Sequence, residues 1–204
     1  YNKNYKGLGV TGRFRSPARV VEEMVQVKKR YPLSVVSLGD DVVTLKPHGW
    51  LQEFSKLYKE KVTLPFNVTT RADNLREEDV KALSEAGLTY VWMGVETGDE
   101  TAANEVFQRD LNNQTIIAAS NLLKKYGVKI LALNIMGLPV KDPFEVDMRT
   151  LDLNLKIKPA LASCGLLYPF PGTTIEKFAI KGGYLGSENQ GEFLESNKRA
   201  SLLN

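Results

Sequence analysis

The strongest constraint on the fold is an alternation of helix-like and strand-like patterns along most of the chain. Residues 16–31 open with Ser16 and Pro17, a common helix start, and continue with apolar residues at helical spacing. Residues 33–42 form a short, β-branched, apolar run that is typical of a buried strand. The alternation then continues with predicted helices at 47–61, 76–87, 99–108, 113–127, 142–158 and 174–185, and predicted strands at 64–73, 89–96, 129–139 and 161–173. Five such units predict an α/β fold with a parallel sheet wrapped by helices, at the spacing of (β/α) barrel units.

Composition is that of an ordinary soluble globular domain. The 204 residues are 43% apolar and 25% charged, and a net charge of +3 is too small to argue for nucleic acid binding. No apolar run reaches membrane-spanning length, and the first residues do not resemble a signal peptide. Cys164 is the single cysteine, which excludes a disulfide framework or a cysteine-based metal site within this chain and suits a reducing, cytoplasmic setting. In the middle of a predicted strand, it is expected to be a small core residue.

Polar residues recur where the predicted strands end. They are Asp40 and Asp41, Arg71, Glu96, Asn134 and Tyr168. In a parallel barrel the carboxyl ends of the strands face the active site, so this recurrence predicts a ligand-binding site at that level. Glu96 is the strongest case, because it follows an apolar run and a buried carboxylate is costly without a partner. Arg71 and Arg109 are the candidate partners.

Structural roles compete with this interpretation. Asp40 and Asp41 equally fit a turn, and Arg71 equally fits a salt bridge to a neighbouring carboxylate. The segment 168–172, rich in proline, fits a rigid loop. His48 lies in a Pro-His-Gly turn signal and is interpreted as a surface or capping residue.

Several motifs, in this order, resemble the radical S-adenosylmethionine (radical SAM) family. They are GLGVTGRFRSPARVVEEM (7–24), the strand ending in Asp40-Asp41, MGVETGDE (93–100), Arg109, LNIMGLP (133–139) and YPFPGT (168–173). The likeness extends from about residue 7 to 185 and is greatest to members that carry an upstream cobalamin-binding domain. It implies a partial (β/α) barrel that is open on one side and carries its cofactor across the strand ends, with cobalamin as a further candidate cofactor.

The resemblance also implies roles for matching residues. The loop at Asp40-Asp41 corresponds to the segment near the methionyl amino group of SAM, while Arg71 belongs to the same row of strand ends. Glu96 and Thr97 lie on the strand that meets the ribose and amino-acid portions. Arg109 matches a basic residue that pairs with the SAM carboxylate, for which a guanidinium is well suited. The segment from Asn134 to Pro139 corresponds to one that packs against adenine, and Tyr168 to one that contacts adenine through its backbone.

One departure from the family is serious. Its members hold a [4Fe-4S] cluster by three closely spaced cysteines after the first strand, and SAM chelates the fourth iron. This sequence lacks that motif, and the resemblance places residue 1 just after it. We therefore interpret the chain as one incomplete core domain, with a loop at 1–15, five βα units at 16–185 and a tail at 186–204. Loss of the cluster in a natural protein is the alternative.

In the family, the reduced cluster cleaves SAM to a 5′-deoxyadenosyl radical, and we expect this chain alone not to run that reaction. Two alternatives come from other classes of protein. One is a carboxylate and Mg²⁺-dependent TIM-type enzyme built on the acidic strand ends. The other is a non-catalytic partial barrel used for protein contacts. An open barrel edge invites strand pairing, so a dimer through that edge is predicted. The sequence identifies no substrate.

Overall fold

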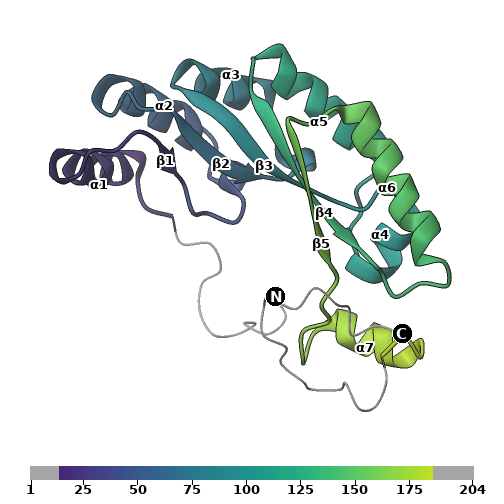
Figure 1. The fold of residues 1–204 in the computed structure, drawn as a ribbon. Coiled ribbons are helices and arrows are strands. Elements are labelled where there is room, and N and C mark those ends of the chain that lie inside the picture. The colour runs from purple at the N-terminus through teal and green to yellow at the C-terminus, as the bar shows by residue number, and fades with distance from the viewer. Residues whose placement is uncertain (1–13, 186–204) are drawn as a thin grey trace. The chain divides into compact units, whose positions relative to one another are not determined.

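The computed structural model describes residues 14–185, which divide into two compact units. Unit 1 comprises the chain up to Met93 together with Ala118–Leu131, and unit 2 comprises Gly94–Ile117 together with the chain from Ala132 onward. The predicted loop at 1–15 and tail at 186–204 therefore lie almost wholly outside the described residues. Strands run in the order β1-β2-β3-β4-β5 within one sheet, as Figure 1 labels them. Each predicted strand is present, and strands that follow one another in the sequence are neighbours in the sheet. This is the order expected of successive βα units.

Unit 1 contains the first two strands, the first part of the third strand and the first three α-helices. Its strands are β1 (Val36–Ser37), β2 (Phe66–Thr70) and the first part of β3 (Leu88–Glu96), and its helices are α1 (Pro17–Arg30), α2 (Trp50–Lys61) and α3 (Glu77–Glu85). The strands pair in parallel, with Val36 opposite Phe66 and Thr70 opposite Met93. Ser16 caps α1 by accepting from the Arg19 amide, as predicted from the Ser-Pro start.

Aromatic side chains from α2 fill the core of unit 1. The rings of Phe54 and Tyr58 pack against Phe66 of β2, at centroid distances of 5.9 and 4.7 Å. All three side chains are fully buried. The Tyr58 hydroxyl has no hydrogen-bond partner among the described residues, and burial raises the Tyr58 pKa to about 12. The aromatic ring therefore supplies the packing, while the hydroxyl is buried at a cost.

We expect Tyr58→Phe to stabilise the chain or leave it unchanged. The substitution keeps the ring and removes a buried donor that makes no hydrogen bond to the part of the chain that the structure describes, so we expect a gain of up to about 1 kcal/mol. Urea unfolding of the two proteins checks this. Phe54→Leu serves as the contrast, because it removes ring contacts and is expected to cost about 1–2 kcal/mol. A Tyr58→Phe protein that loses more than 1 kcal/mol would show that the hydroxyl has a partner after all.

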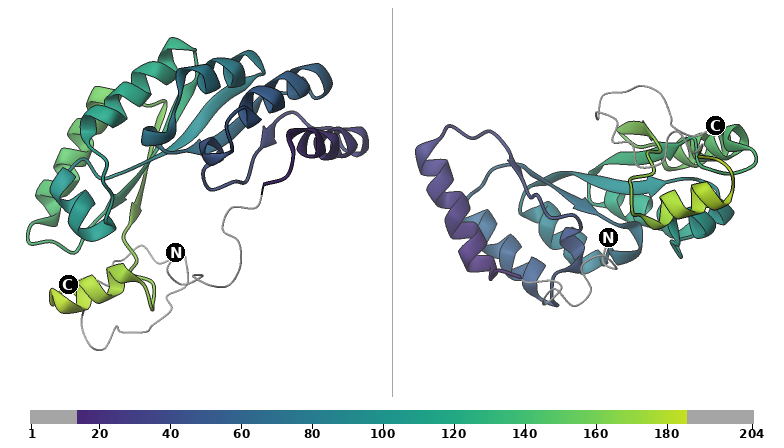
Figure 2. Two further views of the ribbon diagram at one scale, coloured as in Figure 1. Left: turned by 180° about the vertical axis from the view of Figure 1, so that it is seen from behind. Right: turned by 90° about the horizontal axis from the view of Figure 1, so that it is seen from below.

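Unit 2 carries the strand ends and helices of the second part of the chain. Its elements are the end of β3, α4 (Glu100–Phe107), the start of α5 (Asn113–Lys125), most of β4 (Lys129–Met136), α6 (Pro143–Ile157), β5 (Leu161–Leu166) and α7 (Thr174–Lys181). Its core is a cluster of buried apolar side chains: Ala102, Val106, Leu138, Val146 and Leu167. Helices α4 and α7 contact each other. Figure 2 shows α7, in yellow-green, near the C-terminal end of the described chain.

Predicted strands are longer than the observed ones, for local backbone reasons. The strand predicted at 129–139 ends at Met136, because Gly137 takes a φ of 68°. The strand predicted at 161–173 ends at Leu166, before the two prolines of YPFPGT, which lack the amide that a strand ladder needs. The strand predicted at 33–42 is reduced to Val36–Ser37, which pairs with β2.

The prediction that Cys164 is a core residue is wrong. Cys164 is exposed, and every residue of β5 is exposed with it. β5 comes last in the strand order, so among residues 14–185 it has a neighbouring strand only in β4. The apolar run at β5 indicated burial, but a strand at the edge of the sheet is covered less by neighbouring elements than a central strand is. Within residues 14–185, no helix combines the length and the apolar character that crossing a membrane requires.

Candidate functional site

Strand β3 ends at Glu96, whose backbone conformation is strained. Glu96 has a φ of 65°, which is the left-handed region that a residue with a side chain rarely adopts. The Glu96 side chain is 26% exposed. Backbone conformations of this kind cost on the order of 1–3 kcal/mol and persist only where the surrounding contacts outweigh that cost. The sequence pattern of an apolar strand stopping at a carboxylate therefore corresponds to an unusual local geometry.

Arg109 holds this strand end. One guanidinium nitrogen, Nη1, donates to Glu96 Oε1 at 3.0 Å, and the other, Nη2, donates to the Gly94 carbonyl at 3.1 Å. The Arg109 side chain is only 11% exposed, and its Nε has no hydrogen-bond partner among the described residues. Of the two partners that the sequence left open for Glu96, Arg109 is therefore one that the structure provides. A largely buried guanidinium next to a carboxylate is a polar arrangement suited to a zwitterionic ligand.

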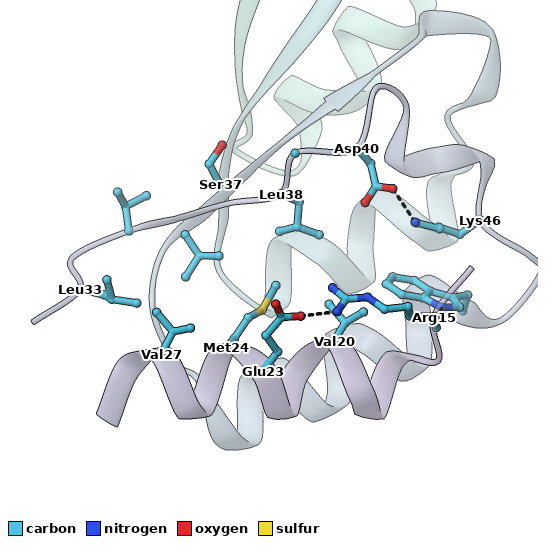
Figure 3. A pocket seen from close by; sticks show the side chains of 14 residues that line it. Arg15, Val20, Glu23, Met24, Val27, Leu33, Ser37, Leu38, Asp40 and Lys46 are labelled. Carbon is cyan, nitrogen blue, oxygen red and sulfur yellow. Dashed lines mark hydrogen bonds and ion pairs between the residues drawn. The ribbon is translucent and has the colours of Figure 1, made fainter. Parts of the chain in front are cut away.

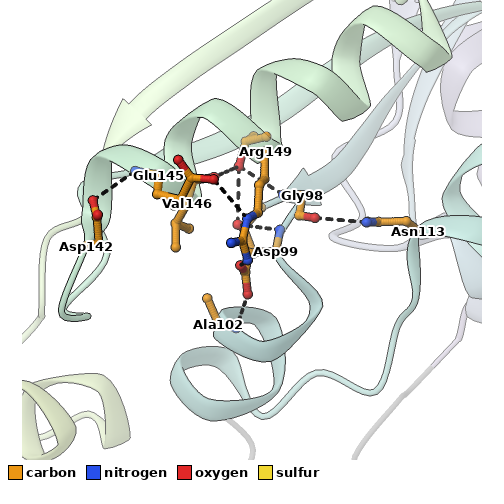
Figure 4. Close-up of polar contacts among 10 residues, drawn as sticks. Gly98, Asp99, Ala102, Asn113, Asp142, Glu145, Val146 and Arg149 are labelled. Carbon is orange, nitrogen blue, oxygen red and sulfur yellow. Dashed lines mark hydrogen bonds and ion pairs between the residues drawn. The ribbon is translucent and has the colours of Figure 1, made fainter.

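The three residues after Glu96 form a turn that lies against α6, and we call Thr97, Gly98 and Asp99 the 97–99 turn. The Gly98 amide donates to the Thr150 hydroxyl at 2.9 Å, and the Thr97 hydroxyl lies 3.2 Å from the same oxygen. A Cβ on Gly98 would lie 2.3 Å from the Arg149 carbonyl oxygen, so only glycine allows this approach. Figure 4 shows α6 lying over the turn, with Asn113 reaching the Gly98 carbonyl from the other side.

Asp99 fastens the turn at its other end. One carboxylate oxygen accepts from the Ala102 amide at 2.8 Å and so caps α4, and the other pairs with Arg149 of α6. Asp99 is only 5% exposed, and a buried carboxylate needs partners that compensate its charge. The Ala102 amide and Arg149 supply that compensation. Hydrogen bonding to Asp99 raises the Arg149 pKa. Thr97, predicted to meet the cofactor, is itself buried and bonded within this turn.

Asn134 faces α6. Its amide donates to the Ser163 carbonyl at 3.1 Å, and its carbonyl oxygen accepts from Asn154 at 2.9 Å. After β4, the Gly137 amide donates to the Asp147 carboxylate at 3.2 Å. Burial raises the Asp147 pKa, and the Gly137 hydrogen bond opposes that rise. The Asn134 side chain is thus occupied by structural hydrogen bonds. Packing of segment 134–139 against adenine stays a prediction.

Tyr168 follows β5 and is half-buried. Its ring meets Phe170 edge-to-face, with centroids 4.8 Å apart. The preceding Leu167 amide donates to the Met136 carbonyl at 2.8 Å, which ties this segment to the end of β4. A contact of Tyr168 with adenine stays a prediction.

Three predicted site residues belong to unit 1. Asp40 pairs with Lys46 at 2.7 Å, and the neighbouring Asp41 is exposed. Arg71 forms a two-pronged contact to Asp73, with distances of 3.0 and 2.6 Å. The alternative prediction for Arg71, a salt bridge to a neighbouring carboxylate, is therefore confirmed. A role for these residues in cofactor binding stays a prediction. His48 is exposed, as expected, and its Nδ1 lies 3.1 Å from Arg76.

Unit 1 also contains an open pocket of about 470 Å³ between α1 and the segment around β1. Figure 3 shows Val20, Met24 and Val27 rising from α1 toward Leu38, with Arg15, Asp40 and Lys46 at one end. The lining is divided between apolar side chains and polar or charged ones. The strand order places β1 at an edge of the sheet. The dimer predicted through the open edge would use this region, and it stays a prediction.

Comparison with known proteins identifies the family. The model of the radical SAM superfamily matches residues 3–151. The chain belongs to the radical SAM superfamily. One relative of this radical SAM chain, an uncharacterized methyltransferase PH0819 from Pyrococcus horikoshii, is 25% identical over 182 residues. That match covers 89% of the chain but only 39% of the relative, so the chain spans well under half of that protein's length.

Two solved radical SAM structures show the same fold. The methyltransferase TsrM from Kitasatospora setae, solved with cobalamin and a [4Fe-4S] cluster, matches with a TM-score of 0.65 and 16% identity over 82% of this chain and 33% of its own. Coproporphyrinogen III oxidase from Escherichia coli matches with a TM-score of 0.63 and 18% identity over 85% of this chain and 41% of its own. The fold is therefore the predicted α/β partial (β/α) barrel of parallel strands.

The residues present do not fit the cluster that the family implies. Three thiolates are required, whereas the 204 residues contain one cysteine, which lies exposed on β5. Residues 14–185 also contain no group of three or more His, Cys, Asp or Glu side chains that could hold a metal ion. Arg109 and Glu96 carry opposite charges and pair with each other. A role for the two residues in binding S-adenosylmethionine stays a prediction.

Sequence reasoning missed the residues of α6 that support the site. Thr150 is 1% exposed and lies on the buried face of α6, between Val146 and Leu153. A hydroxyl on a mainly apolar helix face was the available signal, because such a group needs a partner inside the protein.

Proposed function

We propose that this chain is the S-adenosylmethionine-binding part of a radical SAM enzyme core, and that it binds through the carboxyl end of β3. The observation that carries the proposal is the arrangement of Arg109 and Glu96. The Glu96 carboxylate, on a backbone with positive φ, lies beside the Arg109 guanidinium at the end of a parallel strand. The buried Nε of Arg109 has no hydrogen-bond partner within residues 14–185. A site that stores strain and leaves a donor unsatisfied is poorly explained by stability alone.

Each of the two residues would take one part of the ligand. The Arg109 guanidinium, already held by the Gly94 carbonyl, is oriented to receive the SAM carboxylate without a large loss of side-chain freedom. The Glu96 carboxylate would accept from the ammonium group or the ribose hydroxyls. The segments after β4 and β5, at 134–139 and around Tyr168, are the proposed adenine contacts. A role in cofactor binding is likewise proposed for Asp40, Asp41 and Arg71 of unit 1.

A longer protein would perform the reaction. We propose that, with a [4Fe-4S] cluster supplied by residues outside this chain, bound SAM is the source of a 5′-deoxyadenosyl radical that abstracts hydrogen from a substrate. Cobalamin is proposed as a second cofactor, supported by the fold shared with TsrM. This chain alone, with one cysteine, is not expected to run the reaction. A cytoplasmic setting is part of the same proposal.

Calorimetric titration of SAM into the chain tests this function. We expect measurable binding by the wild type and at least tenfold weaker binding by Arg109→Ala and Glu96→Gln. Lys125→Ala is the matched control, because it removes a cation from an exposed ion pair with Glu77 and should leave the affinity unchanged. A wild-type chain that takes up no SAM at millimolar concentration contradicts the proposal, as does equal affinity in all four proteins.

A further inference from the structure

The hydroxyl of Thr150 connects α6 to the strained end of β3. It donates to the Val146 carbonyl at 3.0 Å, and it can accept from the Gly98 amide at 2.9 Å and the Thr97 hydroxyl at 3.2 Å. These three contacts use its one hydrogen and both lone pairs. Thr97, having donated, accepts from the Asp99 amide at 3.2 Å. Every hydrogen bond around the Thr150 oxygen can therefore form at the same time, with one donor and one acceptor in each.

The consequence for Glu96 follows from the chain connectivity. Glu96 directly precedes the 97–99 turn, and its φ of 65° persists only if the surrounding contacts outweigh the strain. On one side Arg109 holds the side chain, and on the other Thr150 holds the backbone two residues later. Without the hydroxyl, the Gly98 amide would be buried without a partner, and the turn would gain by moving away from α6. Glu96 could then relax to an ordinary negative φ.

We propose that Thr150 is a positioning residue, which sets the direction of the Glu96 carboxylate from α6 without touching the ligand. This inference rests on the proposed function for its effect on SAM, but its effect on the Glu96–Arg109 pair is independent of any ligand. It also explains why α6 carries a buried hydroxyl and Gly98 lacks a side chain at one point of contact.

The test compares Thr150→Val, which keeps the shape and loses the hydroxyl, with Thr150→Ser, which keeps the hydroxyl. We expect SAM affinity to fall at least tenfold in Thr150→Val and to stay within threefold of wild type in Thr150→Ser. Thr44→Val is the matched control, since it removes another buried hydroxyl, the one paired with Thr70 in unit 1 at 2.9 Å. It should cost stability without changing affinity. Thr150→Ala replaces Thr150→Val if the latter does not fold.

A second readout separates this inference from the proposed function. The energetic coupling between Glu96 and Arg109, obtained from urea unfolding of single and double variants, should disappear in the Thr150→Val background and persist with Thr150→Ser. If the wild type binds no SAM, the proposed function fails, and the coupling still decides the role of Thr150. An unchanged coupling in folded Thr150→Val overturns the inference, and so does a Thr150→Ser protein as impaired as Thr150→Val.

Discussion

Gly98→Ala is expected to destabilise the chain by about 3 kcal/mol or more. An added Cβ would meet three backbone atoms of α6, namely the Arg149 oxygen at 2.3 Å, the Arg149 carbon at 2.7 Å and the Thr150 Cα at 2.8 Å. Backbone atoms of a helix cannot rotate away as a side-chain tip can, so the whole 97–99 turn or α6 has to move. The movement would also break the hydrogen bond from the Gly98 amide to Thr150.

Gly165→Ala is the matched control for this prediction. Gly165 lies in β5 of the same unit and has no atom within 4 Å of an added Cβ. It is expected to be neutral or stabilising by up to about 1 kcal/mol, because alanine restricts the unfolded chain. Urea unfolding followed by circular dichroism gives both values. Equal stability of the two variants would mean that the turn does not approach α6 as closely as the structure has it.

Arg109→Ala is expected to cost about 2–3 kcal/mol of stability, which is between the values for exposed and fully buried ion pairs. The substitution removes both the contact to Glu96 and the contact to the Gly94 carbonyl. Glu96, whose backbone is strained, then lacks its ion pair with Arg109. A double-mutant cycle with Glu96→Gln should return a coupling of about 1 kcal/mol. The pair thus stabilises the end of β3 whether or not a ligand is present.

The exposed pair of Lys125 and Glu77 supplies the comparison cycle. Its atoms are closer, at 2.5 Å, but the side chains are 62% and 55% exposed, so its coupling is expected to be indistinguishable from experimental error. Hydrogen bonding to Lys125 lowers the Glu77 pKa, but that group is open to solvent and salt screens it. A Glu96–Arg109 coupling as small as that of the surface pair would contradict the interpretation of Arg109 as a partly buried anchor.

Much of the fold was predictable from the sequence, because local patterns suffice for it. Helical spacing of apolar residues, the Ser16 cap and the β-branched runs predicted each observed strand and α-helix, and their alternation predicted a parallel sheet in chain order. Element ends were less accurate, since they depend on single backbone angles such as that of Gly137 and on which strand has a neighbour. The exposure of Cys164 followed from the edge position of β5, which a local pattern does not contain.

For the site, the sequence by itself determined which residue types end the strands, and it singled out Glu96 because an apolar run rarely stops at a carboxylate. Only the tertiary structure decided that Arg109, thirteen positions later, contacts Glu96, and that Arg71 pairs with Asp73. It also decided that Thr150, more than fifty residues beyond Glu96, holds the adjoining turn. Such contacts depend on how α6 packs against the end of β3. The packing is set by the sum of many side-chain contacts within unit 2, and no short stretch of sequence records it.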